Sequence, residues 1–134
     1  MKKLFFLVVF LSLLSCDKMQ NSINIPDLEF KKYLLREFDN DGDSEISKAE
    51  ALLITEIYVN FSGITSIEGV EYFPNLEGAY CYQSFLETID LSKNHKLKWL
   101  NTRFSYDLET IWLSKKVEGI CDPNSDEWTT VIFK

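Results

Sequence analysis

The most chemically suggestive stretch of the sequence is DNDGDSEISKAE, residues 39–50. Three aspartates alternate at its start, and two glutamates follow. Because the backbone can curl at such a spacing, several of these carboxylates can converge on one point. Carboxylate oxygens are the ligands that Ca²⁺ prefers, whereas Mg²⁺ keeps more of its water. The spacing therefore favours a Ca²⁺ site, and the alternative is a solvated acidic turn that holds no ion.

This stretch resembles the calcium-binding loop of an EF-hand, and helical patterns over residues 27–38 and from Ser47 onward flank it. The resemblance implies ligands at loop positions 1, 3, 5, 7, 9 and 12, with a backbone carbonyl at the seventh and a bidentate glutamate at the twelfth. At the sixth position Ser44 replaces the usual glycine, at a cost on the order of 1 kcal/mol if the chain turns left-handed there. The implied ligands are Asp39, Asp41, Asp43, Glu45, Ser47 and Glu50.

A second pattern begins at residue 54, where apolar residues recur with the spacing L-x-x-L-x-L. Three copies start 22 and 21 residues apart, and a second apolar series lies between them. Units this short bury a core only by stacking, each adding a strand to a parallel sheet. The first series is Ile54-Ile57-Val59, Leu76-Ala79-Cys81 and Leu97-Leu100-Thr102, and the second is Ile64-Ile67, Leu86-Ile89-Leu91 and Leu108-Ile111-Leu113.

The segment LETIDLSKNHKLKWL, residues 86–100, resembles the leucine-rich repeats of bacterial surface lipoproteins. The resemblance implies an α/β solenoid: three leucine-rich repeats over residues 54–118, with a parallel sheet. It also implies an EF-hand-like helical cap over residues 26–53 and a strand cap over residues 119–134. Asn usually follows each strand in this family, and here that column holds serines, which predicts a weaker hydrogen-bond ladder. Those serines are Ser62, Ser84 and Ser105.

The two ends of the repeat region have their own expectations. In the C-terminal cap we expect a turn over residues 122–125 and a strand over residues 128–133. The helix and the cation loop would cover the first repeat, so the cation would act as a staple for a small core.

One face of the predicted sheet is rich in aromatic side chains. Residues between the inward positions of each strand point to the outer, concave face. Aromatic residues and Arg are enriched at binding hot spots, and aromatic rings also stack on sugars. The alternative is that these rings only cover one another. The expected partner-binding residues are Tyr58, Tyr80, Tyr82, Trp99, Asn101 and Arg103.

The first sixteen residues have the pattern of an export signal: two lysines, a short apolar run and Cys16. The run is too short to span a bilayer. The segment resembles the lipobox of bacterial lipoproteins, which implies a signal peptide over residues 1–15, lipidation of Cys16 and a tether over residues 16–25. An ordinary signal peptide is the alternative. Removing residues 1–15 leaves a net charge of −9, which argues against a nucleic-acid partner.

No catalytic constellation is evident, so we expect a protein that is not an enzyme. The one histidine, His95, lies in a turn where we expect surface exposure. Cys81 fits a buried thiol, although export would allow a disulfide with Cys121.

We expect a binding module for a protein or glycan, in the bacterial cell envelope and anchored by lipid at the outer membrane or cell surface. The alternatives are a structural envelope lipoprotein without a ligand and a Ca²⁺ sensor. A single loop favours a structural ion over a sensor, because EF-hand sensors work as pairs.

Overall fold

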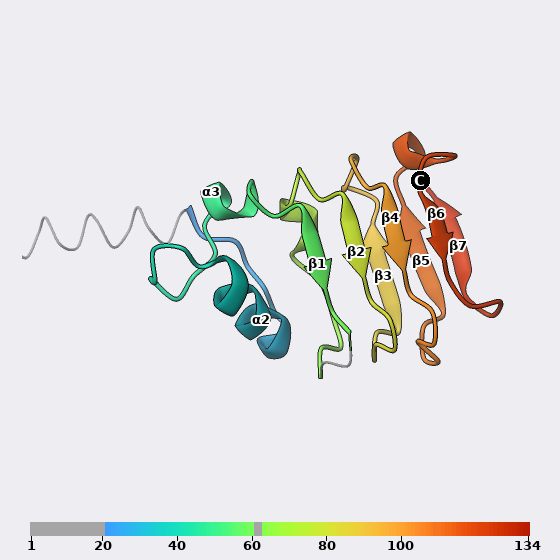
Figure 1. The fold of residues 1–134 in the computed structure, drawn as a ribbon, viewed down its shortest axis with the longest axis horizontal. Helices are drawn as coiled ribbons and strands as arrows, with labels where there is room; N and C mark the ends of the chain where they lie inside the picture. The colour runs from blue at the N-terminus through green and yellow to red at the C-terminus, as the bar shows by residue number, and fades with distance from the viewer. Residues whose placement is uncertain (1–20, 61–62) are drawn as a thin grey trace, which may run out of the picture.

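The computed structural model describes residues 21–60 and 63–134 of the 134-residue chain. They form a parallel-sheet β-solenoid of about three turns, with helices at its N-terminal end (Figure 1). The predicted signal peptide, residues 1–15, and the predicted lipidation site, Cys16, lie outside the described residues. In the part of the chain that is described, no helix has the length and apolar character needed to cross a bilayer.

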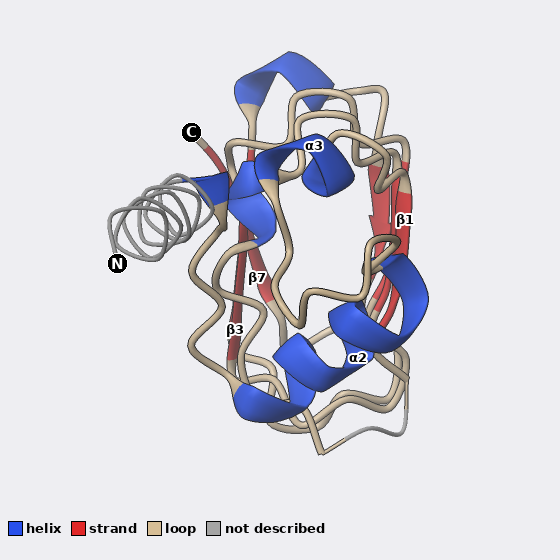
Figure 2. Ribbon diagram, turned by 90° about the vertical axis from the view of Figure 1, so that its left-hand side faces the viewer, coloured by secondary structure: helices blue, strands red, loops and turns tan. Residues whose placement is uncertain are grey.

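Two parallel sheets face each other across the core, as the view along the stack shows (Figure 2). The first sheet has the order β1-β2-β4-β6 and the second β3-β5-β7, so the chain alternates between sheets as it coils. The first contains β1 (Glu56–Tyr58), β2 (Gly78–Tyr80), β4 (Trp99–Asn101) and β6 (Asp122–Asn124). The second contains β3 (Thr88–Leu91), β5 (Thr110–Leu113) and β7 (Thr130–Phe133).

The repeat pattern is confirmed in detail, because all the inward positions of both apolar series are buried. Each fully buried Leu or Ile contributes about 1.5–3 kcal/mol relative to an exposed one. The parallel register also follows the repeat, since Ile57 lies beside Ala79 and Ala79 beside Leu100. The periodic residues thus hold one continuous core between the two sheets.

Helix α2 (Leu28–Phe38) lies at the first end of the stack (Figure 1). It buries Phe30, Tyr33 and Leu34 in the same core as the strands. The Tyr33 hydroxyl accepts a hydrogen bond of 2.9 Å from the backbone N–H of Tyr58, which lies in the edge strand β1. An unpaired strand edge invites association with other chains, and the helix covers part of this one. The short helices are α3 (Lys48–Ala51), η1 (Val70–Tyr72) and η2 (Lys115–Val117).

The described part of the predicted tether is packed against the protein. Ile23 and Ile25 are buried, and Ser22 forms an antiparallel bridge with Ser47. The prediction of a tether over residues 16–25 is therefore wrong for its last residues. Two isoleucines two residues apart are too short a pattern to predict that this segment packs on the core, where the N–H of Ile23 donates to the carbonyl of Ile46.

The C-terminal segment continues the coil that the sequence suggested it leaves. The prediction of a turn over residues 122–125 is wrong, since Asp122–Asn124 is strand β6, parallel to β4. The predicted strand that follows is present as β7, parallel to β5. Pro123 has no N–H to donate and is tolerated because β6 is an edge strand. The last coil therefore adds one strand to each sheet.

Buried polar side chains join successive coils. The Ser105 hydroxyl donates to the carbonyl of Cys81 at 2.8 Å and accepts from the N–H of Ser84 at 3.1 Å. Asn94 donates to the carbonyls of Val70 and Phe73. Ser84 and Ser105 thus link successive coils, whereas Ser62 of the predicted column lies outside the described residues.

The two cysteines in the described residues, Cys81 and Cys121, are buried and form no disulfide. Burial raises the pKa of the Cys81 thiol to about 12, so it stays protonated. It behaves as a small core residue, as expected for the last inward position of its strand.

Candidate binding face and metal loop

The outward side of the β1-β2-β4-β6 sheet, which we call the aromatic face, carries a stacked pair of tyrosines. Tyr58 and Tyr80 lie side by side in the register of β1 and β2. Their ring centroids are 4.7 Å apart and the planes differ by 6°. Tyr58 is still 50% exposed, so the pair offers a ring surface to solvent while its members stabilise each other.

Gly78 makes room for this pair. A Cβ at Gly78 would lie 3.1 Å from Cε2 of Tyr80 and 3.3 Å from Cγ of Glu56, so the Tyr80 ring occupies the space that a side chain would fill. The next strand places Trp99 beside Gly78 in register, and Trp99 is 52% exposed. Asn101 lies beside Tyr80. The predicted alignment of Tyr58, Tyr80, Trp99 and Asn101 on one face is therefore present.

The Tyr58 hydroxyl is tied to a carboxylate on the same strand. It donates to Oε2 of Glu56 at 2.5 Å. This hydrogen bond, with a smaller contribution from desolvation, raises the pKa of Tyr58 to about 12. The phenol therefore stays neutral, and its ring orientation is fixed before any ligand arrives.

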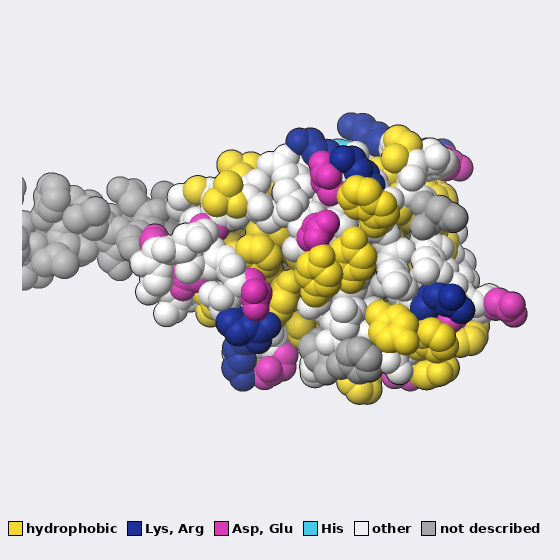
Figure 3. All heavy atoms as spheres, in the orientation of Figure 1, with side chains coloured by type: hydrophobic (Ala, Val, Ile, Leu, Met, Phe, Trp, Pro, Cys, Tyr) yellow, Lys and Arg dark blue, Asp and Glu magenta, His cyan; other side chains and the backbone are white. Residues whose placement is uncertain are grey.

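The other two predicted residues, Tyr82 and Arg103, follow the strands and join a second aromatic group. Tyr82 meets Phe104 edge-on at 5.3 Å between ring centroids. The Arg103 guanidinium lies over the Phe104 ring, 5.3 Å from its centroid, a cation–π arrangement. The second group thus lies beyond the carboxyl ends of β2 and β4. Hydrophobic side chains gather along this lower edge of the molecule in the space-filling view (Figure 3).

Sequence reasoning missed the exposed aromatics in these loops. Phe85 and Tyr106 are 57% and 70% exposed, and Trp128 stacks on Tyr106 with ring centroids 5.8 Å apart. Phe85, Tyr106 and Trp128 follow one another at intervals of 21 and 22 residues, which is the repeat length. Extending the repeat by one column beyond the serines would have found them.

The acidic loop gathers three of the six predicted metal ligands. Asp39, Asp41 and Asp43 each offer a carboxylate oxygen, and these oxygens lie within 4.8 Å of one another. Oxygen donors of this kind suit a hard cation such as Ca²⁺. Asp39 also shapes the loop, because its oxygens accept from the N–H groups of Gly42 and Ser44.

The remaining predicted ligands make other contacts. The Glu45 side chain forms an ion pair with Lys31 at 2.9 Å, which leaves its backbone carbonyl for the predicted role. The hydroxyl of Ser47 caps α3, and Glu50 reaches back to the N–H of Ser47 in a capping box. The other Glu50 oxygen accepts from the N–H of Asn40. Burial alone would raise the pKa of Glu50, but the hydrogen bonds from Ser47 and Asn40 lower it.

Ser44 has the left-handed conformation that the sequence comparison with an EF-hand loop led us to expect. Its φ is 66°, where a residue with a Cβ is strained by about 1–2 kcal/mol. Exchanging Ser44 for Gly should therefore raise Ca²⁺ affinity several-fold, measured by calorimetric titration. Gln83, with φ 50°, gives a matched control, because Gln83→Gly relieves similar strain away from the loop. Equal affinities of wild type and Ser44→Gly would contradict the assignment.

The acidic loop pairs with the chain's own N-terminal segment and not with a second loop of its kind. The N–H of Ile23 donates to the carbonyl of Ile46 at 2.8 Å, so residues 22–23 occupy the loop edge that a second loop could otherwise pair with. This arrangement ties the acidic loop to the solenoid.

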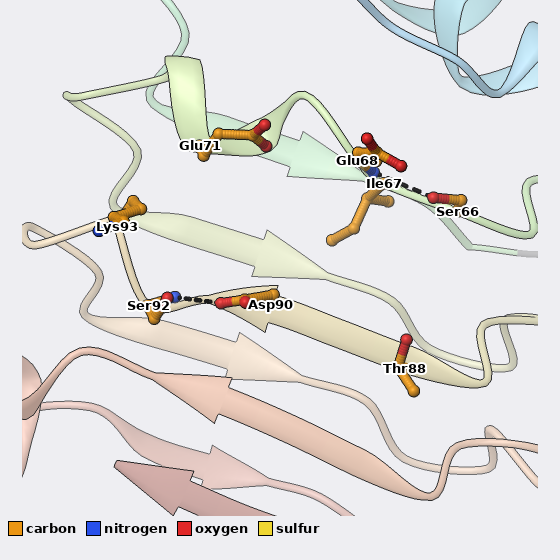
Figure 4. Close-up of a pocket in the computed structure, with 8 residues that line it drawn as sticks. All are labelled: Ser66, Ile67, Glu68, Glu71, Thr88, Asp90, Ser92 and Lys93. Carbon is orange, nitrogen blue, oxygen red and sulfur yellow. Dashed lines mark hydrogen bonds between the residues drawn. The ribbon is translucent and has the colours of Figure 1, made fainter. Parts of the chain in front are cut away.

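A polar hollow of about 400 Å³ lies away from the aromatic face, between η1 and β3. Glu68, Glu71 and Asp90 lie around it, with Lys93 at one side (Figure 4). Burial alone would raise the pKa of Asp90, but hydrogen bonds from Ser92 and Lys134 lower it. Among the described residues, its carboxylates are not close enough together to form a metal cluster.

His95 is exposed, as predicted, and its Nδ1 lies 2.8 Å from the Ser114 hydroxyl oxygen. Such a contact can activate a nucleophile when the serine is accessible. Ser114 is only 2% exposed, and its hydroxyl accepts from the N–H of Lys116 at the start of η2. The contact is therefore best explained as structural.

No protein-family model and no curated protein matches the sequence. Similar solved structures include one of CBM51-2 in complex with GlcNAc and INT domains from Clostridium perfringens ZmpB. It has 24% identity and a TM-score of 0.54, over 71% of this chain and 19% of that one. An internalin from Listeria monocytogenes has 20% identity and a TM-score of 0.47, over 68% and 31% of the two chains. The chain thus spans less than a third of either protein, and the likeness to the ZmpB structure shows a shared fold.

Proposed function

We propose that this chain is a membrane-anchored, calcium-stabilised leucine-rich-repeat module that binds a protein or a glycan through its aromatic face. The observation that carries the proposal is the stacked, half-exposed Tyr58–Tyr80 pair with Trp99 on the neighbouring strand. Large rigid rings give much contact area for little loss of conformational entropy. The role is non-catalytic.

Preorganisation supports a binding role for this face. The hydrogen bond to Glu56 and the stacking on Tyr80 hold Tyr58 in place before a partner arrives. A ligand that meets rings already fixed loses less entropy on binding. Rings that only covered one another would not need to leave Trp99 half exposed one strand away.

The Ca²⁺ part of the proposal rests on the three converging aspartates and the left-handed turn at Ser44. Asp39, Asp41 and Asp43 would hold the ion. Glu50 would close the site only by giving up hydrogen bonds to Asn40 or Ser47. The ion would neutralise clustered charge in a loop that packs on the first coil, which is a stabilising role and not a switching one.

The anchoring part rests on the sequence of residues 1–16 alone. A lipidated Cys16 would keep the solenoid at the outer membrane or cell surface of a bacterium. Lipid chains give a soluble domain a stable membrane attachment.

Exchanging Tyr80 or Trp99 for Ala should weaken partner binding at least tenfold while the melting temperature changes little, because interface hot spots are dominated by such rings. The measurement is affinity capture from the natural surroundings, with and without Ca²⁺, followed by titration of the captured partner. Tyr72→Ala is the matched control, since Tyr72 is 47% exposed but lies on η1.

If the folded Tyr80→Ala and Trp99→Ala variants bind like wild type, the aromatic face is not the binding surface, and a structural envelope role is favoured. A large Ca²⁺-dependent change of shape in X-ray scattering, with the fold retained, would favour a sensor.

A further inference from the structure

Tyr106 and Trp128 form an aromatic ridge at the lower edge of the first sheet, where hydrophobic side chains gather in Figure 3. They come from the loops after β4 and β6. Their planes differ by 18°, yet the two residues remain 70% and 52% exposed. The ridge is separate from the Tyr58–Tyr80 pair and is not explained by burial in the core.

A hollow lies on either side of this ridge, and both hollows are lined by Tyr106 and Trp128. The first, of about 460 Å³, also includes Arg103, Asp126 and Glu127. The second, of about 540 Å³, includes Glu87 and Glu109 and the hydroxyl residues Thr110 and Thr130. These volumes fall within the range of about 300–1,000 Å³ that is typical of small-molecule sites.

The first hollow contains donors and acceptors that are fixed in place. The Arg103 guanidinium is held over the Phe104 ring and carries N–H donors. The side chains of Asp126 and Glu127 line the same hollow, and carboxylate oxygens are hydrogen-bond acceptors.

The occupant must satisfy both kinds of surface. It needs a flat, C–H-rich face for the rings, together with groups that donate to Asp126 and accept from Arg103. Hydroxyl groups do both. A phosphate-bearing ligand is disfavoured by the carboxylates of Asp126, Glu127, Glu87 and Glu109.

We propose that the Tyr106–Trp128 ridge and its two hollows form an oligosaccharide site, distinct from the aromatic face. Pyranose rings pack on the ridge, and hydroxyl groups hydrogen-bond to Asp126 and Arg103. The site goes beyond the proposed function, because it stands whether or not the Tyr58–Tyr80 pair binds a partner.

The test titrates the full chain with three neutral hexasaccharides, cellohexaose, chitohexaose and xylohexaose, using saturation-transfer NMR and calorimetry. At least one is expected to bind with a millimolar or lower dissociation constant. Tyr106→Ala and Trp128→Ala should each weaken that binding at least tenfold, and Asp126→Asn at least threefold. Phe85→Ala should stay within twofold of wild type, because Phe85 is equally exposed one repeat earlier and lines neither hollow.

Melting curves test whether each variant is folded. If Trp128→Ala does not fold, the result is decided by Tyr106→Ala. The proposal is overturned if none of the three sugars binds, if Tyr106→Ala and Asp126→Asn bind like wild type, or if the ridge proves to hold a peptide instead. Tyr80→Ala and Trp99→Ala are titrated with the same sugars. Loss confined to these two variants contradicts the ridge site, whereas loss confined to the ridge variants supports it and counts against a glycan on the aromatic face.

Discussion

Removal of Ca²⁺ is expected to lower the melting temperature of this protein by roughly 10 °C. An ion at a hundredfold excess over its dissociation constant stabilises the folded state by about 2.7 kcal/mol. That excess corresponds to about 10 mM Ca²⁺ if the site has the affinity of about 10⁻⁴ M found in extracellular modules. Each kcal/mol shifts the midpoint by about 4 °C or more for a domain of this size. Calorimetric melts in Ca²⁺ and in chelator measure the difference.

Asp41→Asn supplies the decisive comparison for the proposed stabilisation of the fold by Ca²⁺. The asparagine keeps the oxygen that accepts from the N–H of Asp43 but loses the charge that the ion needs. Its melting temperature should be nearly the same with Ca²⁺ and with chelator. Asp107→Asn, an exposed acidic residue outside the loop, should keep the full Ca²⁺ effect. If chelation does not change the melting temperature of the wild type, stabilisation by Ca²⁺ is ruled out as part of the proposal.

The periodic part of the fold was predictable because each inward position is decided locally. A strand alternates its side chains, and a repeat of 21 or 22 residues returns the chain to the same place in the next coil. That spacing alone put Tyr58 beside Tyr80 and Trp99 beside Gly78. The loop aspartates were predictable for a similar reason, since their convergence needs only the backbone between them.

The parts of the fold that the sequence did not predict depend on contacts between segments that are not related by the repeat. β6 follows β4 after 23 residues, whereas β7 follows β5 after 20, so extending the repeat no longer gives the register. Proline is also disfavoured within strands, so the residue preferences around Pro123 do not predict strand β6. The isolated bridge between Ser22 and Ser47 joins two segments 25 residues apart, and no repeat relates them. Tyr106 and Trp128 keep the repeat spacing of 22 residues, but they lie in the loops one column beyond the serines, outside the strand positions used to predict the binding face.

The Asp27 carboxylate accepts five hydrogen bonds, two that cap α2 and three that join it to the first coil, so its loss should be strongly destabilising. One carboxylate oxygen accepts from the N–H groups of Glu29 and Phe30, as an N-cap. The other accepts from the N–H and hydroxyl of Thr65 and from the N–H of Ser66. A residue thirty-eight positions away in the sequence is thus held by the same carboxylate.

Asp27→Ala should reduce the free energy of unfolding by about 2–4 kcal/mol, combining a lost cap of about 1 kcal/mol with hydrogen bonds to a charged group worth about 1.5–3 kcal/mol. Urea unfolding followed by circular dichroism measures the loss. Asp27→Ser separates the two contributions, because serine caps a helix well but its single hydroxyl is too short to serve Thr65 and Ser66 as well. It should recover about 1 kcal/mol. Equal stability of the serine variant and wild type would show that the link to Thr65 is of no consequence.

The same carboxylate predicts a pH dependence with a definite sign. Burial alone would raise the pKa of Asp27, but the hydrogen bonds from Phe30, Thr65 and Ser66 lower it below its ordinary value. A folded-state pKa below the unfolded value of about 3.9 means that the stabilisation is complete above the unfolded pKa and is lost as the pH falls through the folded one. The gap in stability between wild type and Asp27→Ala should therefore be constant from pH 7 to about pH 5 and shrink below about pH 4. Glu50 and Asp90 also have lowered pKa values, but both proteins contain them, so they cancel in the gap. A gap that stays constant or widens down to about pH 3 would mean that Asp27 stabilises the fold without its charge.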